Sequence, residues 1–126
     1  MVKAWKKVLI VDDDANSIEL TVQAVQLHSP QVSITAAHDG AQCLQMLEQV
    51  MPELVVMDLH MPGVDGWQAL ASIRQNATWQ GLPVVAITAY DSPSVAHDAL
   101  NAGFDAYFPK PIDLRVFTAY LANLGA

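Results

Sequence analysis

VLIVDDDANSI, residues 8–18, joins four apolar residues directly to three consecutive aspartates. The apolar residues, 8–11, have the length and composition of a strand buried on both faces of a sheet. Asp12, Asp13 and Asp14 would repel one another by roughly 4 kcal/mol per pair at ~4 Å and an effective dielectric near 20. These aspartates therefore either point apart into water or surround a cation, and the rest of the chain must distinguish the two arrangements.

Short apolar runs alternate with longer amphipathic stretches along the chain. The runs predict five strands, each buried on both faces: Val8–Val11, Val32–Ala36, Leu54–Met57, Val84–Thr88 and Ala106–Phe108. Helical spacing follows each run, with apolar faces that include Ile18, Val22, Val25 and Leu27; Cys43, Leu44, Leu47, Val50 and Met51; Leu70 and Ile73; Val95 and Leu100; and Leu114, Phe117, Tyr120, Leu121 and Leu124. Strict alternation of strands and helices predicts a doubly wound α/β fold, a (βα)5 three-layer sandwich around a parallel five-stranded sheet.

Composition argues against several classes of function. The 126 residues carry a net charge of −7, and the only basic cluster is Lys3, Lys6 and Lys7, so we expect no binding to nucleic acid. Cys43 is the only cysteine, which excludes an intrachain disulfide, suits the reducing cytoplasm and indicates a buried apolar residue. No apolar run approaches the ~18 residues of a membrane span. We therefore expect a cytoplasmic protein that does not insert into membranes.

Reactive side chains follow the predicted strands at the end where open parallel sheets bind ligands. Asp12 and Asp13 follow the first strand, Asp58 the third, Thr88 ends the fourth, and Lys110 comes just after the fifth. Mg²⁺ takes carboxylate oxygens, and together with one lysine it would balance the charge of three aspartates. Without the metal, we expect neighbouring charges to raise the pKa of at least one of these carboxyl groups.

Asp14 and Asp65 are expected to begin helices. A carboxylate at a helix N-terminus accepts hydrogen bonds from free backbone amides and is favoured by the helix dipole. The three aspartates of residues 12–14 would therefore divide into a pair that faces a cation and one residue that caps the first helix.

Four motifs occur in order at these strand ends: VLIVDDD (8–14), PELVVMDLHMPGVDGWQAL (52–70), PVVAITAY (83–90) and AYFPKPI (106–112). Together they resemble the receiver domain of bacterial response regulators, the CheY-like family. The resemblance covers residues 7 to about 124. It implies the flavodoxin-like strand order 2-1-3-4-5 and a single receiver domain over residues 1–126 with no output domain.

The resemblance implies a phosphoprotein of a two-component or phosphorelay signal transduction system. Asp58 would accept a phosphoryl group from a sensor histidine kinase or a histidine phosphotransfer protein, forming an aspartyl phosphate. Mg²⁺ or Mn²⁺ would be bound by Asp13, by Asp58, by the backbone carbonyl of His60 and, through a water, by Asp12. Such a protein is not an enzyme beyond its own phosphorylation and dephosphorylation.

The resemblance also assigns the residues that sense phosphorylation. The Thr88 hydroxyl, the Ala89 backbone N–H and Lys110 would contact the phosphoryl group, and the Lys110–Pro111 bond would be cis. Thr88 and Tyr107 would form the switch: the hydroxyl moves toward the phosphoryl group and the ring turns into the space it leaves. A downstream protein would read the altered surface of the fourth helix, fifth strand and fifth helix, and a homodimer could form through the last helix region.

His60 and Tyr90 stand two residues after Asp58 and Thr88, at the mouth of the predicted site. In the family these positions vary and influence the lifetime of the phosphoryl group. Both side chains are large here and could screen the acyl phosphate from water. We therefore expect a long-lived phosphorylated form.

Alternative functions remain open at this point. The chain could be a stand-alone receiver or a receiver excised from a hybrid histidine kinase. A haloacid-dehalogenase-like Mg²⁺-dependent phosphatase would use Asp12 as nucleophile and Asp14 as its second acid, but it would give the residues around Asp58 no role. A flavodoxin-like FMN carrier would need a Gly/Ser/Thr-rich phosphate loop after the first strand, and the acidic run stands there instead.

Overall fold

The computed structural model of the chain describes residues 4–124, so Lys3 and both ends of the expected domain lie outside the described residues. The strands are β1 (Lys7–Val11), β2 (Ser33–Ala37), β3 (Leu54–Asp58), β4 (Val84–Thr88) and β5 (Ala106–Pro109). The helices are α1 (Ala15–His28), α2 (Gly40–Val50), α3 (Gly66–Gln75), α4 (Pro93–Ala102) and α5 (Leu114–Asn123). The predicted strand and helix alternation is confirmed, with boundaries that differ by one residue at several strands.

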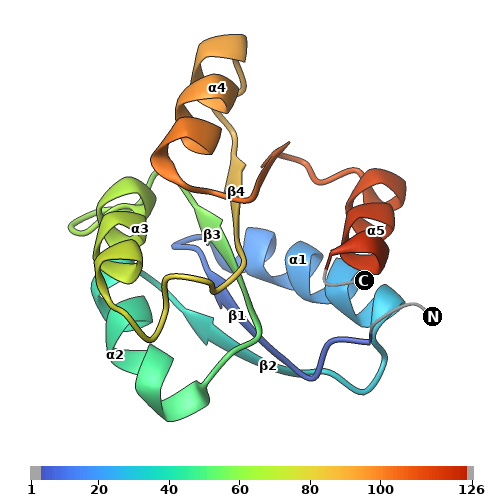
Figure 1. Ribbon diagram of the computed structural model, residues 1–126. Helices are drawn as coiled ribbons and strands as arrows, with labels where there is room; N and C mark the ends of the chain where they lie inside the picture. Colours follow the sequence, from blue (N-terminus) through green and yellow to red (C-terminus); the bar gives the residue numbers. More distant parts are fainter. Residues whose placement is uncertain (1–3, 125–126) are drawn as a thin grey trace.

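All strands are parallel, and their order across the sheet is β2-β1-β3-β4-β5. Helices α1 and α5 cover one face, and α2 and α3 cover the other (Figure 1). This confirms the doubly wound fold and the strand order that the resemblance implied. Because β1 and β3 are neighbours, with Val11 opposite Met57, Asp12 just after β1 and Asp58 at the end of β3 lie side by side.

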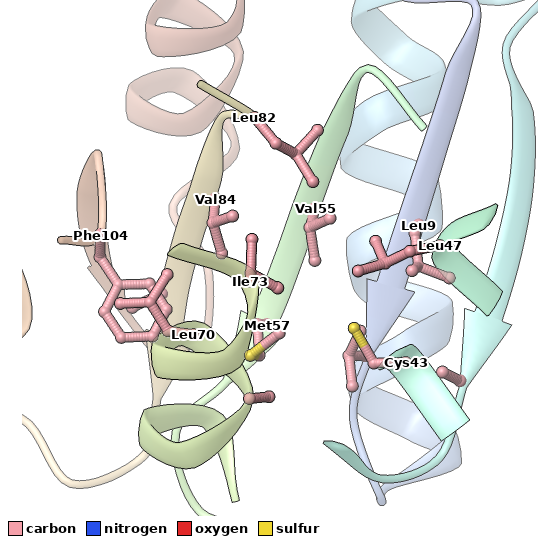
Figure 2. Packing of buried hydrophobic residues seen from close by; sticks show 14 of the residues in the cluster. Leu9, Cys43, Leu47, Val55, Met57, Leu70, Ile73, Leu82, Val84 and Phe104 are labelled. Carbon is pink, nitrogen blue, oxygen red and sulfur yellow. The ribbon is translucent and has the colours of Figure 1, made fainter. Parts of the chain in front are cut away.

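The three central strands are buried on both faces, as predicted. Odd and even positions contribute to different cores, because successive side chains of a strand point to opposite faces. Figure 2 shows Leu9, Val55 and Met57 on the α2–α3 side with Ile73 of α3, and Cys43 lies in the same cluster. Burial raises the pKa of the Cys43 thiol to about 12, so this thiol is protonated at neutral pH.

The prediction of burial on both faces is wrong for the two edge strands. β2 has one buried residue, Ala37, and β5 has one, Phe108. Each edge strand has a neighbour on one side only, so fewer helices cover it. The two edge strands are therefore only partly buried.

Four residues expected on apolar helix faces are exposed. Leu27 is 64% exposed, Met51 53%, Leu100 53% and Leu114 44%. An α-helix turns by about 100° per residue, so Leu100 points away from the core that its neighbour Ala99 enters. Met51 lies beyond the end of α2 in a left-handed conformation with φ 52°, outside the helical stripe.

Aspartates begin α1 and α3, as predicted. The Asp14 side chain accepts a hydrogen bond of 3.2 Å from the Asn16 backbone N–H and caps α1. Asp65 caps α3 and exchanges hydrogen bonds with Gln68 in a capping box. Among residues 4–124, no helix is long and apolar enough to cross a membrane.

Candidate functional site

Asp12, Asp13 and Asp58 converge beyond the carboxyl ends of β1 and β3. One carboxylate oxygen from each residue lies within 4.8 Å of the others. Asp12 is fully buried, Asp58 is 5% exposed and Asp13 is exposed, so the cluster opens to solvent on the Asp13 side. The structure thus brings together the three carboxylates that the sequence placed at neighbouring strand ends.

Lys110 joins two of these carboxylates. Its Nζ lies 2.9 Å from Oδ2 of Asp12 and 3.2 Å from Oδ2 of Asp58. The Lys110 backbone N–H donates to the Thr88 carbonyl at 2.8 Å, and the Lys110–Pro111 bond is cis, as expected. Burial alone would lower the pKa of Lys110, but the contact with Asp12 and the charges of Asp58 and Asp12 outweigh it and raise the pKa. The lysine is therefore a fixed positive charge at the site.

Asp12 is the most deeply buried carboxylate of the cluster. Its Oδ1 accepts a hydrogen bond of 3.0 Å from the Asp14 backbone N–H. Its buried Oδ2 forms the ion pair with Lys110 but receives no directed hydrogen bond. Burial is the main reason that the pKa of Asp12 is raised; Lys110 opposes this increase and the charge of Asp58 adds to it. The expected direction is confirmed, but burial contributes more than the neighbouring charges.

This donor set suits a divalent cation. Mg²⁺ and Mn²⁺ prefer carboxylate and carbonyl oxygens together with water, and the cluster offers three carboxylates with one open side. The buried Oδ2 of Asp12 is an acceptor whose hydrogen-bonding capacity is unmet. A cation here would offset the excess negative charge that Lys110 alone does not balance.

Thr88 lies at the end of β4 beside the cluster. It is fully buried, and its Oγ1 accepts a hydrogen bond of 3.0 Å from the Tyr90 backbone N–H. Asp58 Oδ1 likewise accepts from the His60 backbone N–H at 3.2 Å. The loops after β3 and β4 are thus each hydrogen-bonded to the side chain of the last residue of the strand, Asp58 and Thr88 respectively.

His60 and Tyr90 contact each other above these two loops. Their ring centroids lie 4.5 Å apart with an interplanar angle of 70°, an edge-to-face arrangement. Both residues are exposed. Edge-to-face pairs of aromatic rings attract one another, so the two side chains form one unit that spans the loops after β3 and β4.

The model of the response regulator receiver domain family matches residues 8–122. The chain belongs to this family. The receiver is 33% identical over 110 residues to an uncharacterized 14.6 kDa protein of Leptolyngbya boryana, covering 87% of the chain and 82% of that protein. It is 34% identical to the response regulator MprA of Mycobacterium avium over 94% of the chain, and it spans 50% of that relative.

Solved structures agree with this assignment. The receiver superposes on a putative response regulator from Chloroflexus aurantiacus with a TM-score of 0.87 at 25% identity, covering 97% of the chain and 98% of that structure. The family places the chain in two-component signalling, where receiver domains interact with histidine kinases and downstream effectors.

The sequence did not predict the contacts of two residues around the site. Gly66 begins α3 directly against β3, and a Cβ at this position would overlap the Asp58 carbonyl oxygen. Its N–H donates to the Leu59 carbonyl at 3.1 Å, which fixes the loop after Asp58. Asp91 accepts a hydrogen bond of 2.6 Å from the hydroxyl of Tyr107, the predicted switch residue. An exposed aspartate 16 positions away from its partner has no distinguishing pattern in the sequence.

Proposed function

We propose that this receiver accepts a phosphoryl group on Asp58 from the phosphohistidine of a histidine kinase or a histidine phosphotransfer protein. The proposal rests above all on the position of Asp58, which is buried, lies 3.2 Å from Lys110 and shares a cluster with two further carboxylates at the carboxyl end of the sheet. A carboxylate is ionised at neutral pH and needs no general base to attack phosphorus. The obstacle to the reaction is electrostatic repulsion, which this site is arranged to reduce.

In the proposed reaction, a carboxylate oxygen of Asp58 forms a bond to phosphorus while the bond from phosphorus to the donor imidazole breaks. The imidazole nitrogen keeps the electron pair of the broken bond. A divalent cation held by Asp12, Asp13, Asp58 and the His60 carbonyl would neutralise charge on the transferring group. Lys110 supplies a second, permanent positive charge, since phosphoryl transfer depends mainly on positioning and charge stabilisation.

Thr88 and Ala89 would bind the phosphoryl oxygens, through the Thr88 hydroxyl and the Ala89 backbone N–H. In the structure, the Thr88 hydroxyl accepts a hydrogen bond from the Tyr90 backbone N–H. This bond would break when the hydroxyl turns toward the phosphoryl group. Tyr107 would then reorient, and the surface of α4, β5 and α5 would change for a downstream protein. We also propose that the receiver forms a homodimer through the same region and that it is located in the cytoplasm.

The phosphatase alternative is disfavoured by the position of Asp14. A D-x-D phosphatase would need Asp12 and Asp14 at one cation, but the Asp14 carboxylate accepts from the Asn16 backbone and the Ser17 hydroxyl at the start of α1. It is therefore occupied as a helix cap, and the cation cluster contains Asp13 instead.

Intact-mass measurement tests the proposed function. We expect acetyl phosphate with Mg²⁺ to add the mass of one phosphoryl group to the receiver and EDTA to prevent the addition. Steady turnover of a phosphoester that requires Asp12 and not Asp58 would instead indicate a phosphatase.

The His60–Tyr90 pair is expected to slow hydrolysis of the aspartyl phosphate, because the paired rings limit the approach of water to Asp58. Replacing both residues by alanine should accelerate loss of the phosphoryl group on the order of tenfold, equivalent to 1.4 kcal/mol of activation free energy. The decay can be followed by intact mass after removal of the donor. His97→Ala, which removes an exposed histidine of α4, is the control. An unchanged decay rate in the double variant would show that the pair does not shield the site.

A further inference from the structure

The hydroxyl of Tyr107, on β5, is bound by Asp91 of the loop that follows β4. It donates a hydrogen bond of 2.6 Å to Oδ1 of Asp91. This length is typical of a charge-assisted bond from a hydroxyl to a carboxylate. The orientation of Tyr107 is therefore coupled directly to the loop between β4 and α4.

That loop, residues 89–92, is anchored at both of its ends. Next to the phosphorylation site, the Tyr90 N–H is bonded to the Thr88 hydroxyl. At its other end, Ser92 caps α4 through its side chain. Helix α4 buries only Ala99, so few core contacts hold it in place and its position depends on the loop.

Phosphorylation as proposed above would release one of these two anchors. In the conformation described here, which we call the Thr88-bonded conformation, the Thr88 hydroxyl accepts from Tyr90. Once the hydroxyl turns to the phosphoryl group, the Ser92 cap still joins the loop to α4, and the bond between Asp91 and Tyr107 still joins the loop to β5 and opposes movement of the ring.

We propose that Asp91 is a positioning residue for the switch: by holding Tyr107, it stabilises the Thr88-bonded conformation and limits how readily phosphorylation switches the receiver. This inference rests on the proposed function of Asp58. It assigns a role to a carboxylate that lies outside the cation cluster.

Thermodynamic linkage gives the size and sign of the expected effect. A contact that exists in one conformation and is lost in the other lowers the affinity of any ligand that favours the second conformation. Beryllofluoride, which mimics an aspartyl phosphate, should therefore bind more tightly when Asp91 can no longer accept from Tyr107. From the typical net contribution of one hydrogen bond, we expect a gain of roughly fivefold.

Calorimetric titration with beryllofluoride and Mg²⁺ measures this affinity. Asp91→Ala should gain roughly fivefold, and Asp91→Asn should gain less, because its amide oxygen still accepts a hydrogen bond without the charge. Glu48→Ala removes a negative charge from an exposed position of α2, away from the switch, and should match the wild type. Equal or weaker binding by Asp91→Ala, with normal binding by the wild type, would overturn the inference and leave the proposed function intact. A wild type that binds no beryllofluoride would instead remove the proposed function and, with it, the inference.

A second readout does not involve phosphorylation. Partial burial, the hydrogen bond to Asp91 and the charge of Asp91 raise the pKa of Tyr107 to about 12. Spectrophotometric titration, with Tyr107→Phe to identify the signal and circular dichroism to confirm folding, should show a lower pKa in Asp91→Ala. An unchanged titration would mean that Asp91 does not hold Tyr107 and would overturn the inference.

Discussion

Asp58→Asn is expected to abolish phosphorylation and, in the absence of divalent cations, to raise the free energy of unfolding by about 1 kcal/mol. The asparagine keeps the shape of the side chain but offers no carboxylate to attack phosphorus. It also removes one of three negative charges that converge beside Lys110, so the Thr88-bonded conformation loses internal repulsion. The Asp58 carboxylate, which the proposed reaction requires, is thus predicted to lower the free energy of unfolding when no divalent cation is bound.

The cation should reverse this difference. Mg²⁺ binds the folded wild type and stabilises it by mass action, whereas Asp58→Asn has lost a ligand and should gain less. Thermal unfolding with Mg²⁺ and with EDTA measures both effects. Asp14→Asn is the matched control, because it makes the same substitution at a helix cap where asparagine is as effective as aspartate. Phosphorylation of Asp58→Asn at the wild-type rate, or an Asp58→Asn protein less stable than the wild type in EDTA, would contradict the prediction.

Arg74→Ala is expected to cost about 2–4 kcal/mol of unfolding free energy and to lower the melting temperature by roughly 10 °C. From α3, the Arg74 guanidinium donates to the carbonyls of Leu82 at 2.6 Å and Gly103 at 2.9 Å and pairs with Asp105 at 3.1 Å. These bonds tie α3 to the loop before β4 and to the turn before β5. Leu82 and Phe104, from those two segments, line the core beside α3 (Figure 2).

The lower stability of Arg74→Ala should appear as a lower midpoint of denaturant unfolding, with an unchanged dependence of the unfolding free energy on denaturant concentration. Arg74→Lys should recover little of the stability, because an ammonium group cannot reproduce the planar fork of donors that these carbonyls accept from. Arg115→Ala, at an exposed position of α5, is the control and should change the free energy by less than about 0.5 kcal/mol. If Arg74→Ala were as stable as the Arg115 variant, the network around Arg74 would have no structural importance.

The fold was predictable because its signals are local. Apolar runs, helical spacing and capping aspartates such as Asp14 and Asp65 identified every element within residues 4–124. The strand order came from the resemblance and not from periodicity, since no local pattern records which strands become neighbours. The predicted apolar helix faces were wrong near helix ends, where Leu27 and Met51 are exposed because they lie beyond the turns that pack against the core.

The candidate site was predictable where residue type and strand position coincide, as for Asp12, Asp58, Thr88 and Lys110. The contacts that surround it were not. Most acceptors of Arg74 are backbone carbonyls, which leave no trace in residue identity. The partner of Tyr107 is an exposed aspartate whose importance depends on the path of a loop in three dimensions.

The most direct test of the central claim is chemical identification of the phosphorylated residue. After reaction with a phosphohistidine donor and Mg²⁺, borohydride reduces an aspartyl phosphate to homoserine, which peptide mass spectrometry can locate. Our account predicts homoserine at position 58 and at no other aspartate. Homoserine at Asp12 or Asp13, or a phosphoryl group retained on a histidine of the receiver, would contradict it.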